Sequence, residues 1–178
     1  ILGYAQLLLD TPREAHETFE RLQLINDAWP ATSLHRARGL LEVARYGDAR
    51  DAARSCLASS PPRMLRARAL AVLGLAVGRA EPDSRADAEA ALTESISLCF
   101  ELRLRPYLAE AHHFMAEMLV GQRDRRGASY FAIEAEAGYR KCSMHAHAAE
   151  VSRMGLHPPT STKGLAWNLP PAEERQRH

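Results

Sequence analysis

The sequence predicts an all-α protein, an α-solenoid in which antiparallel helical hairpins stack one after another. Hydrophobic residues make up 46% of the 178 residues but aromatic residues only 6%. Alanine and leucine therefore supply most of the apolar side chains, which suits helices that pack closely. No run of alternating Val, Ile or Thr indicates a strand. The length and the periodicity indicate about four hairpins followed by a terminal helix.

The first hairpin is expected at the N-terminal end of the chain. Residues 1–9 are predicted to end its first helix, and residues 12–26 to form its second. Asp10-Thr11-Pro12 supplies the helix start, because a capping side chain is followed by a proline that suits the first turn. Trp29-Pro30 closes the hairpin, since the residue before a proline is displaced from helical geometry.

The second hairpin is expected over residues 31–60. Its first helix is predicted to stop at Gly47, because glycine suits the position that ends a helix. Asp48 is then predicted to open the second helix of the pair. The run Ser59-Ser60-Pro61-Pro62 ends this helix.

The third and fourth hairpins follow the same scheme. The third is expected to have a first helix that ends near Gly78 and a loop over residues 79–85. The fourth is expected to begin by Pro106, to turn at residues 122–124 and to continue to about Lys141.

A last short helix is expected over residues 144–154. The predicted domain organisation is a helical-repeat domain over residues 1–155 and an irregular, proline-containing tail over residues 156–178. Trp167 and its neighbours form the one apolar patch of the tail. This patch is interpreted either as a segment that docks on the array or as a short recognition motif.

Each predicted second helix carries one small residue at a matching position: Ala15, Ala52, Ala88 and Ala128. Successive members lie 37, 36 and 40 residues apart, which is a period typical of helical repeats. Where antiparallel helices cross closely, only glycine or alanine lets the two backbones approach. These four residues are therefore expected at helix crossings.

This pattern resembles the tetratricopeptide repeat (TPR), in which a small residue in the first helix faces alanines in the second. The matching small positions in the first helices are Gly3, Gly39 or Leu40, Gly74 and Ala116. Gly47-Asp48 matches the family's turn between helices. The resemblance covers about residues 1–141. The chain departs from the pattern in a period longer than about 34 residues, in a missing first-helix aromatic residue and in the absence of a proline after the fourth hairpin.

The long, degenerate repeats are also similar to sensor arrays of large bacterial signalling proteins, which join such arrays to an ATPase, a cyclase or a DNA-binding regulator. Residues 102–111 and 122–124 carry this resemblance. It implies a protein-interaction or sensor segment of a larger cytoplasmic regulatory protein. The chain begins at Ile1 without a methionine, and we expect it to be part of a longer one.

The resemblance also implies a binding groove on the concave face, which the first helices of such arrays form. Projecting the family's groove positions onto this sequence selects eight residues: Tyr4, Leu8, Leu41, Arg45, Leu75, Arg79, His113 and Glu117. Exposed leucines beside arginines suit a protein or peptide partner that combines apolar anchors with an acidic group. The alternative is that these leucines pack against neighbouring helices.

Charge is unevenly distributed along the chain, although the net charge is only +1. Residues 36–79 contain nine arginines and three acidic residues, whereas residues 81–101 contain six acidic residues and one arginine. This segregation predicts two differently charged solvated faces, or a field that steers a partner. Nucleic-acid binding is a third function class, disfavoured by the low net charge and by the lack of aromatic residues among the arginines.

A metal site and an active site are both disfavoured by the motifs. Cys142, His145 and His147 are ligand types for zinc, with His112 and His113 as further candidates, but their spacing matches no closed zinc site. Cys56 and Cys99 fall at periodic apolar positions, which is typical of core residues.

Glu110 and Glu117 lie two helical turns apart and can share a face, as solvated carboxylates often do. No Gly-rich phosphate loop and no G-x-S-x-G motif is present. We therefore expect no enzyme activity, cofactor or metal.

The remaining expectations concern compartment and assembly. No segment has the roughly 18 uninterrupted apolar residues of a membrane span. Three widely spaced cysteines favour a reducing cytoplasm over a disulfide framework. Homodimerisation through an open end of the array is the alternative to a partner groove, because an uncovered terminal hairpin exposes apolar surface.

Overall fold

A computed structural model describes residues 29–156, and the regular structure in this range is helical throughout. The helices are α3 (Pro30–Glu42), α4 (Tyr46–Ala58), α5 (Arg63–Ala80), the short 3-10 helix η1 (Pro82–Ser84), α6 (Arg85–Glu101), α7 (Arg105–Gly121), α8 (Arg125–Lys141) and α9 (His145–Arg153). The predictions for the first hairpin and for the tail, including Tyr4, Leu8 and Trp167, lie outside the described residues.

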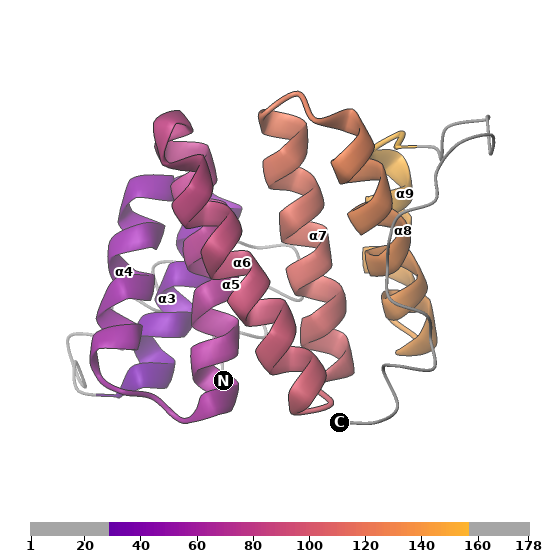
Figure 1. The fold of residues 1–178 in the computed structure, drawn as a ribbon. Coiled ribbons are helices and arrows are strands. Elements are labelled where there is room, and N and C mark those ends of the chain that lie inside the picture. Colours follow the sequence, from indigo (N-terminus) through magenta and orange to yellow (C-terminus); the bar gives the residue numbers. More distant parts are fainter. Residues whose placement is uncertain (1–28, 157–178) are drawn as a thin grey trace.

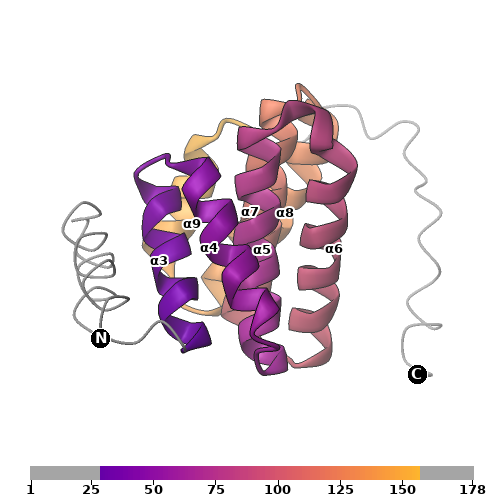
Figure 2. The ribbon, with the colours of Figure 1, turned by 90° about the vertical axis from the view of Figure 1, so that its left-hand side faces the viewer.

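The helices form antiparallel hairpins that stack in chain order. α3 pairs with α4, α5 with α6, and α7 with α8, and each hairpin also contacts the next one. Figure 1 shows the hairpins side by side, from α3 and α4 at one end to α9 at the other. In the turned view of Figure 2 the helix axes run along roughly one direction. The predicted all-α solenoid of helical hairpins is confirmed.

The turn inside the first described hairpin differs from its prediction. α3 ends at Glu42 and α4 begins at Tyr46, so Gly47 and Asp48 lie inside the first turn of α4 and do not form the connection. The residue with left-handed backbone geometry is Ala44, at φ 57°. The prediction of a cap at Gly47 is wrong, because the backbone N–H groups of Ala44 and Arg45 already bond to carbonyl groups at the end of α3.

These hydrogen bonds define a Schellman turn. The backbone N–H of Arg45 donates to the carbonyl of Leu40, and that of Ala44 donates to Leu41, both at 2.9 Å. The same pair of bonds recurs around Arg103, Arg123 and Ser143, which also have positive φ. Since each turn has three residues and α6, α7 and α8 each have 17, these helices and α9 begin 20 residues apart.

Small residues lie where the helices cross, as predicted. Ala52, Ala88 and Ala128 are buried, and so are Gly39, Gly74 and Ala116 in the first helices. One close approach joins α5 to α6: a Cβ atom at Gly74 would lie 2.5 Å from Leu92 Cγ and 2.9 Å from the Ala88 carbonyl oxygen. Only glycine fits at this crossing.

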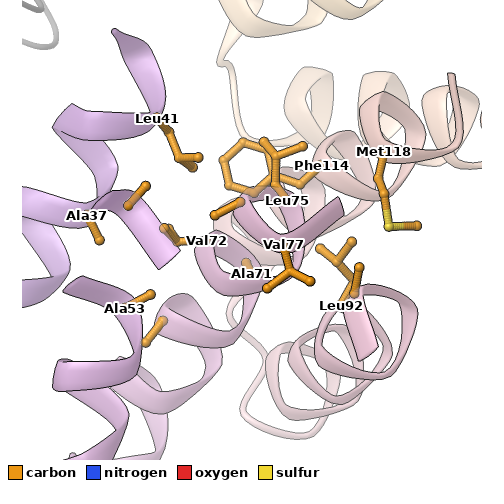
Figure 3. Close-up of a cluster of buried hydrophobic side chains, with 14 of the residues drawn as sticks. Ala37, Leu41, Ala53, Ala71, Val72, Leu75, Val77, Leu92, Phe114 and Met118 are labelled. Atoms are coloured by element: carbon orange, nitrogen blue, oxygen red, sulfur yellow. The ribbon is translucent and has the colours of Figure 1, made fainter. Parts of the chain in front are cut away.

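The core runs along the stack between the hairpins. Figure 3 shows how side chains from successive helices meet there, with Leu41, Leu75 and Phe114 on one side and Leu92 and Met118 on the other. Cys56 and Cys99 are buried core thiols, as their periodic positions predicted. A buried hydroxyl is satisfied within the same region, because Ser95 Oγ donates to the carbonyl of Ala67 at 2.7 Å.

The crossing at Gly74 can be tested with two alanine substitutions. Gly74→Ala is expected to lower the free energy of unfolding by about 1–3 kcal/mol, because the added methyl group overpacks the contact with α6. Gly47→Ala is the matched control: a Cβ there meets nothing within 4 Å, and alanine should stabilise the helix by about 0.5–1 kcal/mol. Urea unfolding measures both. Equal effects of the two substitutions would contradict the close crossing.

The left-handed turn residues provide a second test. Ala44→Gly is expected to raise the free energy of unfolding by about 0.5–1 kcal/mol, because glycine adopts positive φ without a steric penalty. Gly155 has φ +65° and open space around its Cα atom, so Gly155→Ala is expected to lower stability by a similar amount. Thermal unfolding followed by circular dichroism distinguishes the two signs, and a lower stability of Ala44→Gly would refute the strained turn.

Candidate binding groove

A groove of about 620 Å³ lies along the first helices of the hairpins. Its lining comes from α3, α5, α7 and α9, with contributions from the start of α4 and from α8. The side chains are mixed in character: aromatic rings, histidines, arginines and glutamates surround an apolar floor. The groove therefore lies on the side of the stack that the first helices of the hairpins and α9 line.

Four of the eight predicted groove residues line it: Leu41, Leu75, His113 and Glu117. The two leucines are only 8% and 4% exposed and belong to the core. The expectation of exposed leucine anchors is therefore wrong for Leu41 and Leu75, because both side chains pack with Phe114 in the core (Figure 3).

The other two described positions lie beside the groove and do not line it. Arg45 lies in the turn between α3 and α4, and its Nε is 2.7 Å from Asp48 Oδ2 in an exposed ion pair. Arg79 lies near the end of α5 and pairs across the helices with Glu117 at 3.5 Å. Both arginines thus have carboxylate partners within the chain.

Arg38 on α3 has its charge compensated inside the groove. Arg38 Nε is 3.1 Å from Glu42 Oε1, and its other end pairs with Glu110 on α7. The guanidinium carbon also lies 5.1 Å from the centre of the Phe114 ring. Arg38 therefore combines an aromatic support with two carboxylates, which is the usual way to stabilise a partly buried guanidinium.

His113 is the centre of a buried cluster at the other side of the groove floor. Its Nε2 is 3.3 Å from Glu117 Oε1, and its ring meets Tyr139 edge-on at 6.0 Å between ring centres. Tyr139 in turn contacts His147 on α9 at 5.2 Å. Burial lowers the pKa of His113 to about 4, and burial raises the pKa of Glu117. His113 is therefore neutral at neutral pH.

Arg68 on α5 differs from the other groove arginines described above. Its guanidinium carbon lies 4.4 Å from the centre of the Tyr107 ring on α7. Its Nε is buried and has no hydrogen-bond partner among the described residues. Sequence reasoning missed both Arg68 and Tyr107, because the arginines between residues 36 and 79 look alike until the helices are packed.

The segregation of charge along the sequence is largely cancelled in space. Acidic residues of the region 81–101 pair with arginines of the preceding basic region, as in Arg66 on α5 with Glu94 on α6 at 2.7 Å. Arg63 with Glu101 and Arg50 with Glu81 form further pairs. The interpretation of two separately charged faces is therefore wrong for these residues.

Within residues 29–156, no group of three or more His, Cys, Asp or Glu side chains is placed to hold a metal ion. Among the helices of the same range, none combines the length and apolar character needed to cross a membrane.

Comparisons with known proteins define the class of fold. No family model matches the sequence, and no curated protein does either. The helical hairpins form a TPR-like repeat fold. Among solved structures, the chain is similar to MamA, a TPR-like protein whose crystal structure aligns with a TM-score of 0.51 at 14% identity. The alignment covers 88% of this chain and 93% of that one. At this identity the similarity establishes the fold alone.

The buried state of His113 predicts a dependence of stability on pH. The unfolded chain takes up a proton near pH 6.5 but the folded His113 only near pH 4, so stability falls as the pH drops through this window. Between pH 7.5 and pH 5 we expect a loss of about 2 kcal/mol from this residue. The measurement is urea unfolding of the wild type and of His113→Gln across the window.

The variant isolates His113 because other groups titrate in both proteins. His35, whose pKa is also lowered to about 4 by burial, contributes equally to each. Glu117 acts with the opposite sign, since a raised carboxyl pKa favours the folded state at low pH. Identical pH slopes for the wild type and His113→Gln would show that His113 is not the titrating group.

Proposed function

We propose that this chain is a protein-interaction scaffold that binds a peptide or a segment of a partner protein in the concave groove. The observation that carries the proposal is the groove itself, with its apolar floor, its aromatic rim and the charged Arg68, held by helices from successive hairpins. Because packed hairpins preform this surface, little ordering entropy is lost when a partner docks.

Binding is favoured over catalysis by the way the charged groups are used. Arg38 is neutralised by Glu42 and Glu110, and Glu117 is paired with Arg79. These side chains stabilise the walls of the groove, and no pair of them has the arrangement of a nucleophile and its base. The proposed role is therefore non-enzymatic.

The cellular setting of the proposal comes from the sequence resemblance. The array is proposed to serve as the interaction or sensor segment of a larger bacterial regulatory protein in the cytoplasm. Nucleic acid is a poor candidate for the groove, because the described lining has no excess of positive charge for a phosphate backbone. Three arginines line it (Arg38, Arg68 and Arg153) beside four glutamates (Glu42, Glu110, Glu117 and Glu150).

Homodimerisation is the second candidate function. It is supported by large apolar side chains outside the groove, in particular Phe100 at 71% and Trp29 at 63% exposure, because such residues are enriched at interfaces. Light scattering over a range of concentrations separates the candidates. A stable dimer favours self-assembly, and a monomer at high concentration favours the partner groove.

A matched pair of substitutions on α9 tests the groove. Ala146 and Ala149 are both exposed, but only Ala146 lines the groove. Ala146→Trp is expected to reduce capture of a partner from the source organism's lysate by tenfold or more, because the indole fills the groove. Ala149→Trp is expected to leave capture unchanged. Equal capture by both variants would place the binding surface elsewhere.

A further inference from the structure

We propose that Arg68 and Tyr107 form an anchor for the side-chain carboxylate of an aspartate or glutamate in the bound protein segment. This inference rests on the proposed function and specifies the chemistry of the groove's occupant. Arg68 comes from α5 and Tyr107 from α7, and both line the groove. The anchor is thus built from neighbouring hairpins and exists only when they are packed together.

The geometry identifies Arg68 as a donor without an acceptor. Its Nε is buried without a hydrogen bond, and no carboxylate within residues 29–156 forms an ion pair with it. The Tyr107 ring lies 4.4 Å from the guanidinium carbon and supports one face of the group. A stacked guanidinium keeps the N–H donors along its edge available, and these donors match the two oxygens of a carboxylate.

Arg38 provides an internal comparison in the same groove. It too has its guanidinium over an aromatic ring, at 5.1 Å from the centre of Phe114, but it also has Glu42 and Glu110 as partners. Arg68 has an aromatic ring beside its guanidinium group but no carboxylate partner among the described residues. A carboxylate from a bound segment would therefore give Arg68 the same kind of partner that Glu42 and Glu110 give Arg38.

The surroundings select a single carboxylate over a polyanion. Four glutamates line the groove with three arginines, and Arg38 already pairs with two of those glutamates, so a chain of phosphates meets no run of unpaired cations along the described lining. One acidic side chain on an otherwise neutral or basic segment needs a single counter-ion and meets it at Arg68. The buried Nε stays covered in either state, so a bound carboxylate interacts with the terminal nitrogens of the guanidinium group through charge-assisted hydrogen bonds.

The test is selection of peptides from a random 12-residue display library with the full chain. Selected peptides are expected to carry Asp or Glu at one fixed position. Replacing that residue by Asn or Gln should weaken binding by about tenfold or more to the wild type. The same replacement should have little effect on binding to Arg68→Gln, so the two substitutions form a double-mutant cycle.

Two further variants separate the anchor from general charge and from misfolding. Arg66→Gln removes an exposed arginine two residues away that pairs with Glu94, and it should retain the preference for an acidic residue. Arg68→Lys keeps the charge but not the planar guanidinium, and it should lose most of the preference. The melting temperature of Arg68→Gln should be equal to or higher than that of the wild type, because the substitution removes an unpartnered buried donor.

The outcomes distinguish this inference from the proposed function. The anchor is overturned, and the groove retained, if Ala146→Trp blocks binding of the selected peptides but those peptides carry no conserved acidic residue. The same conclusion follows if Arg68→Gln binds acidic peptides with the same preference as the wild type. If no peptide is selected, or if Ala146→Trp does not block binding, both proposals fail. A dimer that dissociates on Arg68→Gln would assign the carboxylate to a second copy of the chain and overturn the inference of a separate partner.

Discussion

The close passage of α5 between its neighbours is the constraint on which the rest of the structure depends. At Gly74 the backbone of α5 meets Ala88 and Leu92 of α6, and a Cβ at Gly78 would lie 2.6 Å from Met118 Cγ on α7. Two glycines one helical turn apart therefore fix the distance of α5 from both partners. Since α5 and α7 contribute Leu75, Arg68, Tyr107 and Glu117 to the groove, the contact at Gly78 bears directly on the spacing of these two groove helices.

The fold could be predicted from the sequence because its determinants are local. Helical periodicity and a small residue per crossing, such as Ala88 or Ala128, are visible without knowing which helices meet. The turn at Gly47 was predicted wrongly for a physical reason. A sequence rule places left-handed geometry on glycine, but in the structure the hydrogen bonds that close α3 place it on Ala44. The backbone hydrogen bonds of the turn outweigh the modest steric cost of the Ala44 methyl group at positive φ.

The groove could be predicted only in outline. A resemblance to TPR repeats located Leu41, Leu75, His113 and Glu117 among its lining residues, yet it could not tell that the leucines are buried. Arg68 was beyond sequence reasoning, because its environment depends on Tyr107, a residue 39 positions later on another hairpin. Whether an arginine has a partner is a property of packed helices. The ion pairs that cancel the charge segregation, such as Arg66 with Glu94, were hidden for the same reason.

The repeated three-residue turns have a consequence for how the chain acquires its structure. The described helices mainly contact helices one or two places away in the sequence, although Arg38 on α3 also reaches Glu110 on α7. Such a topology has low contact order, which favours fast folding. It also makes the array quasi-one-dimensional: order can begin in any hairpin and spread to its neighbours, and the cooperative length is set by the interfaces between hairpins.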